Sequence, residues 1–343
     1  QTTGGADNFT GTSSGDTFLA VSDAAFDNGD VVDGAGGTDT LKTRYSLNGA
    51  KTVNGAVTNV ENVTVDLDDG KTGTAETLTF SVDGFTGLTN LTAIDGSSTA
   101  ATEDTLKFTN IAAGVVLGVT NGDANTIYNF GYADTSSGTN SETLNLNTAK
   151  AQNVIIAGIE TLTIDTTGKT TLDELNAAAA TKIVLTGSGA LKISDLDSGT
   201  NTVLKTIDGS AATGKLTLDG FIAGDVVVTG GSGDDKFDFT DNGIGTADKL
   251  DGGDGSDTLV VAANSTTSLA TNSKSIEKLE GKTADIGGAA TLTLSGKTLS
   301  TITTFIANAN TATNDDDATF AVTNMDSGDT IQVLSGGGDS TSL

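Results

Sequence analysis

The sequence contains no cysteine, no histidine, no proline and no tryptophan. These absences exclude disulfide bonds, thiolate or imidazole metal sites, and catalysis by a nucleophile paired with an imidazole. The chain carries 17 lysine and arginine residues against 45 aspartate and glutamate residues, which gives a formal net charge of −28. Lysine and arginine residues are too few to form a basic patch that could bind phosphates. We therefore do not expect nucleic acid as a partner.

Long apolar runs are also missing. No stretch approaches the roughly 18 residues of a membrane span, so we expect no membrane insertion. Aromatic residues make up 4% and hydrophobic residues 36% of the 343 residues, which leaves a lean core of valine, isoleucine, leucine and alanine. The lack of cysteine is typical of secreted surface proteins of Gram-negative bacteria, and we expect that location. The repeat pattern is cut at both ends, so we expect the chain to be a fragment or a processed portion of a longer protein.

What the chain does contain is glycine, threonine, asparagine and aspartate, with 45 glycines in all. Its apolar residues alternate with polar ones and rarely run together, as in short strands joined by tight turns. Oxygen ligands are abundant while nitrogen and sulfur ligands are absent, and this combination selects hard cations. The composition therefore favours Ca²⁺ as the bound ion.

The clearest motif is a nonapeptide of the form G-G-x-G-x-D-x-U-x, in which U is apolar. Three units occur, at residues 230–238, 243–251 and 252–260. Their position-six aspartates are Asp235, Asp248 and Asp257, and their apolar residues at position eight are Phe237, Leu250 and Leu259. The N-terminus repeats the arrangement in weaker form, with Asp7, Asp16, Asp30 and Asp39 at position six and Phe9, Phe18, Val32 and Leu41 at position eight.

Such nonapeptides wind a chain into a parallel β-roll, in which six residues form a turn and three form a strand whose position-eight side chain enters the core. Successive turns fall on opposite sides of the roll, so the first and third units should stack on the same side, with the Asp235 and Asp257 turns facing each other. Their oxygens would form a cage for Ca²⁺. The complete set of expected ligands is Gly230, Ser232, Asp234, Asp235, Asp248, Gly252, Asp254, Asp257, Asp7, Asp16, Asp30 and Asp39. The alternative is that these turns are merely solvated hairpins.

In addition to the nonapeptides, the sequence repeats with a longer period of about 105 to 110 residues. It divides the chain into expected repeats at residues 1–118, 119–227 and 228–332, with a truncated fourth at 333–343. Each repeat carries a strand-like phrase with a glutamate at one position, namely Glu61, Glu160 and Glu277. We interpret these glutamates as structural hydrogen-bonding residues of the coil. Two acidic runs, at residues 66–69 and 315–317, are either further calcium ligands or solvated loops.

Local patterns predict an all-β fold with one possible exception. Alternation predicts strands at Glu76–Val82, Thr181–Thr186 and Ala290–Leu294. The segment Leu172–Ala180, which reads LDELNAAAA, is the best candidate for a short helix, with Thr170 or Thr171 as its N-cap.

The nonapeptides resemble the RTX repeats of proteins exported by type I secretion. Together with the phrases NVENVTVD and GIETLTID in an acidic chain without cysteine, they make the sequence similar to the calcium-dependent S-layer proteins of Gram-negative bacteria such as Caulobacter and Campylobacter. The resemblance implies a calcium-rich β-solenoid that assembles into a lattice with copies of itself. It also implies lipopolysaccharide binding by a region outside this chain.

The function implied is that of a structural component of a bacterial surface layer, which folds and assembles on extracellular calcium. Cytosolic calcium is too scarce to fill weak sites, so the acidic chain would stay unfolded and exportable. The alternative is an RTX adhesin segment that binds a host or cell-surface ligand. An enzyme is not expected, because the chain has no histidine or tryptophan and only three tyrosines.

Overall fold

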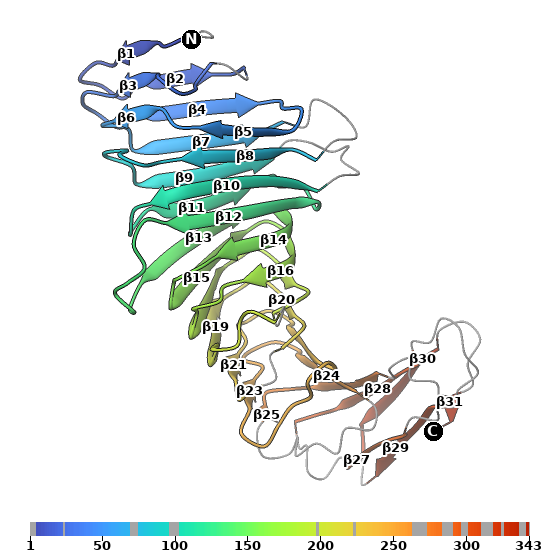
Figure 1. Ribbon diagram of the computed structural model, residues 1–343. Helices are drawn as coiled ribbons and strands as arrows, with labels where there is room; N and C mark the ends of the chain where they lie inside the picture. Colours follow the sequence, from blue (N-terminus) through green and yellow to red (C-terminus); the bar gives the residue numbers. More distant parts are fainter. Residues whose placement is uncertain are drawn as a thin grey trace. The chain divides into compact units, whose positions relative to one another are not determined.

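The computed structural model describes residues 5–22, 25–68, 75–95, 103–196, 199–221, 224–262, 273–282, 291–295, 301–309, 318–323, 326–335 and 341–342. All regular elements in these ranges are β-strands, stacked in parallel as a β-solenoid of about 11 turns (Figure 1). The predicted all-β parallel solenoid is confirmed. The described part of the chain has no helix with the length and apolar character of a membrane span.

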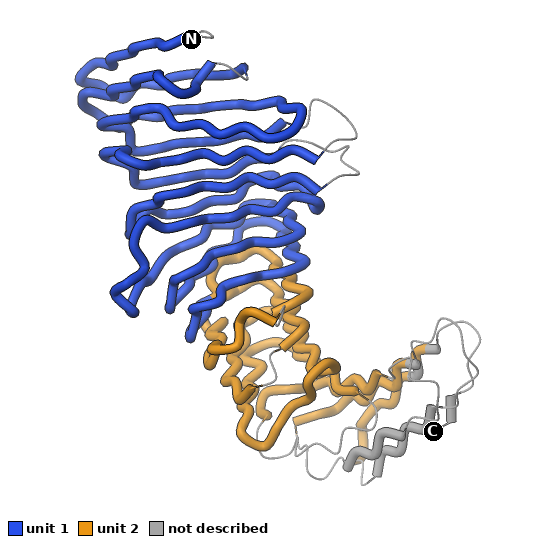
Figure 2. Tube along the Cα trace, in the orientation of Figure 1, with its two compact units in different colours: residues 1–184 blue, residues 185–343 orange. Residues whose placement is uncertain are grey.

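The chain divides into two compact units, Gln1–Val184 and Leu185–Leu343, drawn in blue and orange in Figure 2. Strand β17 (Lys182–Gly187) contains the boundary. The predicted boundaries of the long repeats are a different division of the chain, and they stay a prediction.

Unit 1 contains strands of three parallel sheets. The first sheet has the order β5 (Ala50–Val53), β8 (Thr77–Ser81), β10 (Asp104–Ile111), β12 (Thr126–Tyr132), β14 (Lys150–Ile156) and β16 (Thr170–Asn176). The second has the order β2 (Thr17–Ala20), β4 (Thr40–Tyr45), β7 (Asn62–Leu67), β9 (Asn90–Asp95), β11 (Val116–Thr120), β13 (Ser141–Asn147) and β15 (Thr161–Thr167). The third is short, with β1 (Asn8–Thr10), β3 (Val31–Asp33) and β6 (Ala56–Thr58).

Unit 2 follows the same plan. One set of strands has the order β18 (Leu191–Ile193), β20 (Leu216–Leu218), β22 (Lys236–Phe239), β24 (Thr258–Ala262), β26 (Lys278–Lys282), β28 (Thr304–Ala309) and β30 (Thr330–Ser335). A second set has the order β19 (Thr206–Ala212), β21 (Val227–Thr229), β23 (Lys249–Asp251) and β25 (Ser273–Lys274). A third has β27 (Thr291–Ser295), β29 (Ala318–Thr323) and β31 (Thr341–Ser342).

The nonapeptide register is confirmed. The first and third units of the 230–260 block end in β22 and β24, which pair in parallel with Phe237 aligned to Leu259. The middle unit ends in β23, on the other sheet, where Leu250 aligns with Val228. All three position-eight side chains are buried, as the β-roll geometry requires.

The short helix expected at 172–180 is wrong. Residues 170–176 form β16, which pairs in parallel with β14, and Leu172 and Leu175 are both fully buried. The alanines that favoured a helix lie in a tight turn, in which the Ala180 N–H donates to the Ala177 carbonyl over 2.8 Å. Helix propensity is weaker than the hydrogen bonds and apolar burial that the adjacent coil supplies.

The core of unit 1 contains a row of phenylalanines along consecutive coils. Phe80, Phe108 and Phe130 align in the register of β8, β10 and β12 and are fully buried. The Phe108 and Phe130 rings are stacked, with centroids 5.3 Å apart and planes 9° from parallel. This row gives a chain poor in aromatic residues several of its largest buried side chains where coils meet.

Replacing Phe130 with leucine is therefore expected to lower the free energy of unfolding by about 1 to 2 kcal/mol, from lost ring stacking and lost volume. Urea unfolding followed by circular dichroism measures this difference. The exposed substitution Thr52→Ser on β5 is a control that should change stability by less than about 0.5 kcal/mol. Equal effects of the two substitutions would contradict the role of the ring stack.

Candidate metal-binding turns

Acidic residues recur where the chain enters a strand, and we call them the corner acids. The corner acids are Asp30, Asp39, Glu61, Asp104, Glu160, Asp235, Asp248, Asp257 and Glu277. The carboxylate of each accepts the backbone N–H of the residue at the equivalent position on the preceding coil, over 2.6 to 2.8 Å. Each carboxylate therefore supplies a charge-assisted hydrogen bond where the chain turns into the sheet.

The corner acids of the 230–260 block form a column. The Leu216 N–H donates to Asp235 Oδ1 over 2.7 Å, and the Asp235 N–H donates to Asp257 Oδ1 over 2.7 Å. The Asp257 N–H donates in turn to Glu277 Oε2 over 2.8 Å. The Asp235 and Asp257 turns are stacked as predicted. Their carboxylates, however, follow one another along the solenoid, each bonded to the coil before it.

Two of the predicted ligands in the 230–260 block have both carboxylate oxygens bonded to backbone, as does Asp30 in the N-terminal block, which accepts the N–H groups of Asp7 and Asp27. Asp235 Oδ2 accepts the Gly231 N–H over 2.8 Å in addition to the Leu216 bond. Asp248, at the opposite corner, accepts the N–H groups of Val226 and Gly245 over 2.7 Å and 2.6 Å. These two aspartates are therefore built into the coil stack whether or not an ion is bound.

Asp257 differs from them. Its side chain is fully buried, and its Oδ2 has no hydrogen-bond partner among the described residues. The pKa of Asp257 is raised to about 7, mainly by burial and also by the nearby carboxylates of Asp235 and Glu277, against the lowering effect of the Asp235 N–H. Burial also raises the pKa of Asp235, against the opposing effect of the N–H groups that it accepts. The column therefore holds negative charge that its own hydrogen bonds do not fully compensate.

The glycine at position one of each turn leaves room for converging oxygens. A Cβ on Gly252 would lie 1.9 Å from the Ser275 carbonyl oxygen and 2.4 Å from Asp257 Oδ2. A Cβ on Gly230 would lie 2.1 Å from the Gly252 carbonyl oxygen and 2.7 Å from Asp235 Oδ2. A carboxylate oxygen and a carbonyl oxygen of the next coil thus share the space that a side chain would fill.

The N-terminal block repeats this geometry. The N–H groups of Asp7 and Asp16 donate to Asp30 and Asp39 over 2.8 Å and 2.6 Å. Asp39 is fully buried, and its Oδ2 has no hydrogen-bond partner among the described residues. A Cβ on Gly34 would lie 2.4 Å from that oxygen and 2.0 Å from the Asn59 carbonyl oxygen. Asp39 is therefore the N-terminal counterpart of Asp257.

The other predicted ligands lie on the outer part of the turns. Ser232, Asp234 and Asp254 are exposed. Asp234 Oδ1 accepts the Ser256 N–H over 2.9 Å, and the Asp254 N–H donates to the Gly231 carbonyl over 2.9 Å. These bonds join stacked turns, one through the Asp234 carboxylate and the other between backbone groups.

The two acidic runs have different outcomes. Asp66 and Asp68 form ion pairs with Arg44, while residues 315–317 lie outside the described residues.

Sequence reasoning identified part of the corner-acid pattern. Glu61, Glu160 and Glu277 are structural hydrogen-bonding residues of the coil, as predicted. Asp104 was missed, although it too lies where the chain enters a strand, and its Oδ1 accepts the Glu76 N–H over 2.7 Å. Asp104 could have been predicted from its position as an acidic residue at the start of a segment in which apolar and polar residues alternate. This criterion does not require the nonapeptide motif.

Within the described ranges, no three acidic side chains gather closely enough to hold a metal ion by themselves. The turns instead offer one buried carboxylate oxygen beside one carbonyl oxygen, a donor set of the hard type that Ca²⁺ takes. Comparisons with protein-family models, with curated proteins and with solved structures find no match to this chain.

The raised pKa of Asp257 predicts that, without divalent cations, stability falls as the pH rises from about 4 to above 7. The unfolded chain releases this proton near pH 4 whereas the folded protein keeps it to about pH 7, so the folded state binds more protons in this window. Urea unfolding at several pH values in EGTA measures the slope. Because the other carboxylates titrate too, the prediction concerns the difference from Asp257→Asn, whose slope should be less negative. Identical slopes would contradict it.

Proposed function

We propose that this chain is a calcium-dependent β-solenoid segment of a bacterial surface layer, with a structural role and no catalytic one. The observation that carries the proposal is the pair of buried, unpartnered carboxylate oxygens of Asp257 and Asp39, each beside a carbonyl of the next coil. An uncompensated buried carboxylate is costly, and a bound cation removes that cost. The proposal also rests on the resemblance of the nonapeptides to RTX repeats.

In the C-terminal block, the proposed ligands at one turn are the Asp257 carboxylate and the Ser275 carbonyl. At the turn before it they are the Asp235 carboxylate and the Gly252 carbonyl, with the exposed Asp234 and Asp254 supplying outer oxygens. Water would complete a shell of the 6 to 8 oxygens typical of Ca²⁺. The ion would supply positive charge between coils that otherwise stack carboxylate on carboxylate.

Sites of this kind, with few carboxylates each, belong to the weak extracellular class, with dissociation constants of about 10⁻⁴ to 10⁻³ M. Cytosolic calcium would leave them empty, and a chain with a net charge of −28 would then be only marginally stable in its folded form. Calcium outside the cell would neutralise the columns, so the folded state would reach its full stability only after export.

Size-exclusion chromatography and electron microscopy test whether the chain assembles into a lattice when calcium is bound. The purified chain, at matched concentration in about 1 mM CaCl₂ and in EGTA, is applied to size-exclusion chromatography and then imaged by negative staining. We expect sheet-like arrays or oligomers in calcium and a single smaller species in EGTA. Isolated rods in calcium would contradict lattice formation. Rods that bind a cell-surface ligand would favour the RTX adhesin instead.

A further inference from the structure

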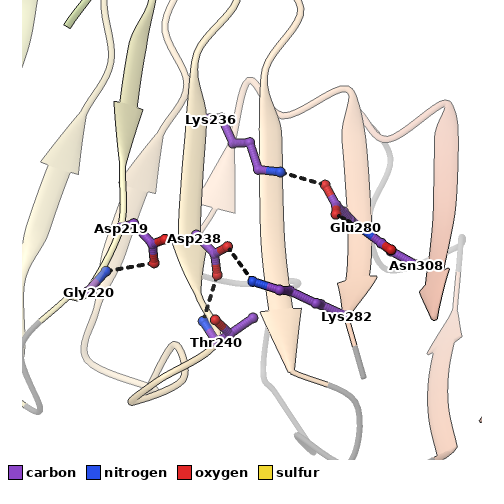
Figure 3. Close-up of polar contacts among 8 residues, drawn as sticks. All are labelled: Asp219, Gly220, Lys236, Asp238, Thr240, Glu280, Lys282 and Asn308. Atoms are coloured by element: carbon purple, nitrogen blue, oxygen red, sulfur yellow. Dashed lines mark hydrogen bonds and ion pairs between the residues drawn. The ribbon is translucent and has the colours of Figure 1, made fainter. Parts of the chain in front are cut away.

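A lysine, a glutamate and a carboxamide meet on the outer face of three strands of unit 2 (Figure 3). The Lys236 Nζ on β22 donates to Glu280 Oε2 on β26 over 2.8 Å. The Asn308 Nδ2 on β28 donates to the other oxygen, Glu280 Oε1, over 2.6 Å. One carboxylate thus binds an amine and a carboxamide at the same time, and the two groups come from residues far apart in the sequence.

Glu280 lies on the outer face of the sheet but is largely inaccessible to solvent. Asp238, Val260 and Glu280 occupy one register position on β22, β24 and β26, and Val260 is fully buried. Glu280 itself is only 6% exposed. Lys236 reaches from β22 past β24 to Glu280, and Lys282 reaches from β26 to Asp238 on β22, with Nζ and Oδ2 3.6 Å apart. The two ion pairs span β24, where Val260 lies, and Glu280 is largely shielded from water.

We propose that Lys236 and Asn308 join in an intramolecular amide bond, with Glu280 as the catalytic residue that carries the proton. The Lys236 ammonium gives a proton to the Glu280 carboxylate, and the neutral amine attacks Cγ of Asn308. The C–N bond to Nζ forms while the bond from Cγ to Nδ2 breaks. Glu280 returns its proton to the leaving nitrogen, which departs as ammonium together with the second proton of Nζ. The reaction needs no oxidant, reductant or other reactant.

Positioning is what favours this reaction over a simple ion pair. Because Oε1 and Oε2 belong to one carboxylate, the amine and the carboxamide are held as neighbours, and such confinement strongly accelerates an intramolecular attack. Lys282 aligns with Asn308 in the backbone register of β26 and β28, but its Nζ is paired with Asp238. Lys236 is therefore the amine that Glu280 presents to Asn308.

The bond would give the chain a covalent cross-link that cysteine does not provide, since the sequence has no cysteine. It would tie β22 to β28 and close the intervening chain into a loop. Like a disulfide, such a closure restricts the unfolded chain and stabilises the folded one. This inference does not depend on calcium or on lattice formation.

Mass spectrometry of the folded, purified chain tests the proposal. We expect a proteolytic digest to contain a branched peptide that joins Lys236 to Asn308, and an intact mass lower by one ammonia molecule. Because cyclisation of Gln1 and of Asn–Gly sequences such as Asn242–Gly243 also releases ammonia, the decisive readout is the branched peptide, sequenced by tandem fragmentation.

Three variants complete the test. Lys236→Arg and Glu280→Gln should lack the branched peptide, whereas Lys278→Arg, on the same strand as Glu280, should retain it. Circular dichroism spectra matching the parent identify the variants that fold, and Lys236→Arg keeps the positive charge beside Glu280. A folded parent chain that yields only the linear peptides after prolonged incubation would overturn the proposal. A branched peptide that persists in Glu280→Gln would overturn the role of Glu280.

Discussion

Replacing Gly252 with alanine is expected to lower the free energy of unfolding by about 3 kcal/mol or more. The added Cβ would lie 1.9 Å from the Ser275 carbonyl oxygen, and because that oxygen belongs to the backbone of the next coil, relief requires the coils to separate. The Cβ would also lie 2.4 Å from Asp257 Oδ2, the oxygen proposed to bind calcium. Both the fold of the turn and its calcium response should therefore be lost.

Gly245 provides the matched control in the neighbouring turn. Its added Cβ would meet only Asp248 Oδ2, at 3.4 Å, and the Gly245 N–H that donates to Asp248 is kept in alanine. Gly245→Ala should change stability by less than about 1 kcal/mol. Urea unfolding of the two variants and the parent in calcium compares them directly. If Gly252→Ala lowers the free energy of unfolding no more than Gly245→Ala does, the coils do not approach each other closely at position one of the turn.

The second large effect is expected when the stacked corner acids Asp235 and Asp257 are each replaced with asparagine. The two substitutions should change the stability of the chain in opposite directions. Asp235→Asn should destabilise the chain by about 1 to 3 kcal/mol, because both Asp235 oxygens accept backbone N–H groups and an NH₂ cannot replace one of them. Asp257→Asn should stabilise the calcium-free chain by about 1 kcal/mol at pH 8. It removes a buried charge and places an NH₂ close to the Ser275 carbonyl oxygen.

In the presence of calcium, the stabilising effect of Asp257→Asn is expected to be lost. Asp257→Asn removes the carboxylate proposed to bind the ion, so the calcium concentration at half-maximal stabilisation should rise by about tenfold or more, equivalent to about 1.4 kcal/mol of binding free energy. Thermal unfolding at a series of calcium concentrations gives this midpoint for each variant. A parent and an Asp257→Asn variant with the same midpoint would exclude Asp257 as a ligand.

The sequence predicted the solenoid because a nine-residue spacing leaves few alternatives. Phe237 and Leu259 align on one sheet while Leu250 lies on the other, as alternate turns require. The glutamates at 61, 160 and 277 were also predictable as coil residues, since a shared position in a long repeat implies a shared place in the stack. Periodicity fixes where side chains lie along the solenoid.

Periodicity does not fix which atoms a carboxylate bonds. The sequence predicted an oxygen cage for an ion from the Asp235 and Asp257 turns, which stays a prediction, but it did not predict that each carboxylate accepts an N–H from the preceding coil. Whether the second oxygen is bonded, as in Asp235, or unpartnered, as in Asp257, depends on the local turn. The segment 172–180 was misassigned for a related reason, because the partner strand that overrides helix propensity comes from β14 and is invisible in the local sequence.

The most direct test of calcium-dependent folding is thermal unfolding of the whole chain, followed by circular dichroism, in EGTA, in about 1 mM calcium and in about 1 mM magnesium. Several weak sites filled only in the folded state should raise the unfolding midpoint in calcium by on the order of 5 to 10 °C over EGTA. Magnesium should have little effect, because it dehydrates reluctantly and demands octahedral geometry. Equal midpoints in all three solutions, with the same β-sheet spectrum at low temperature, would contradict the account.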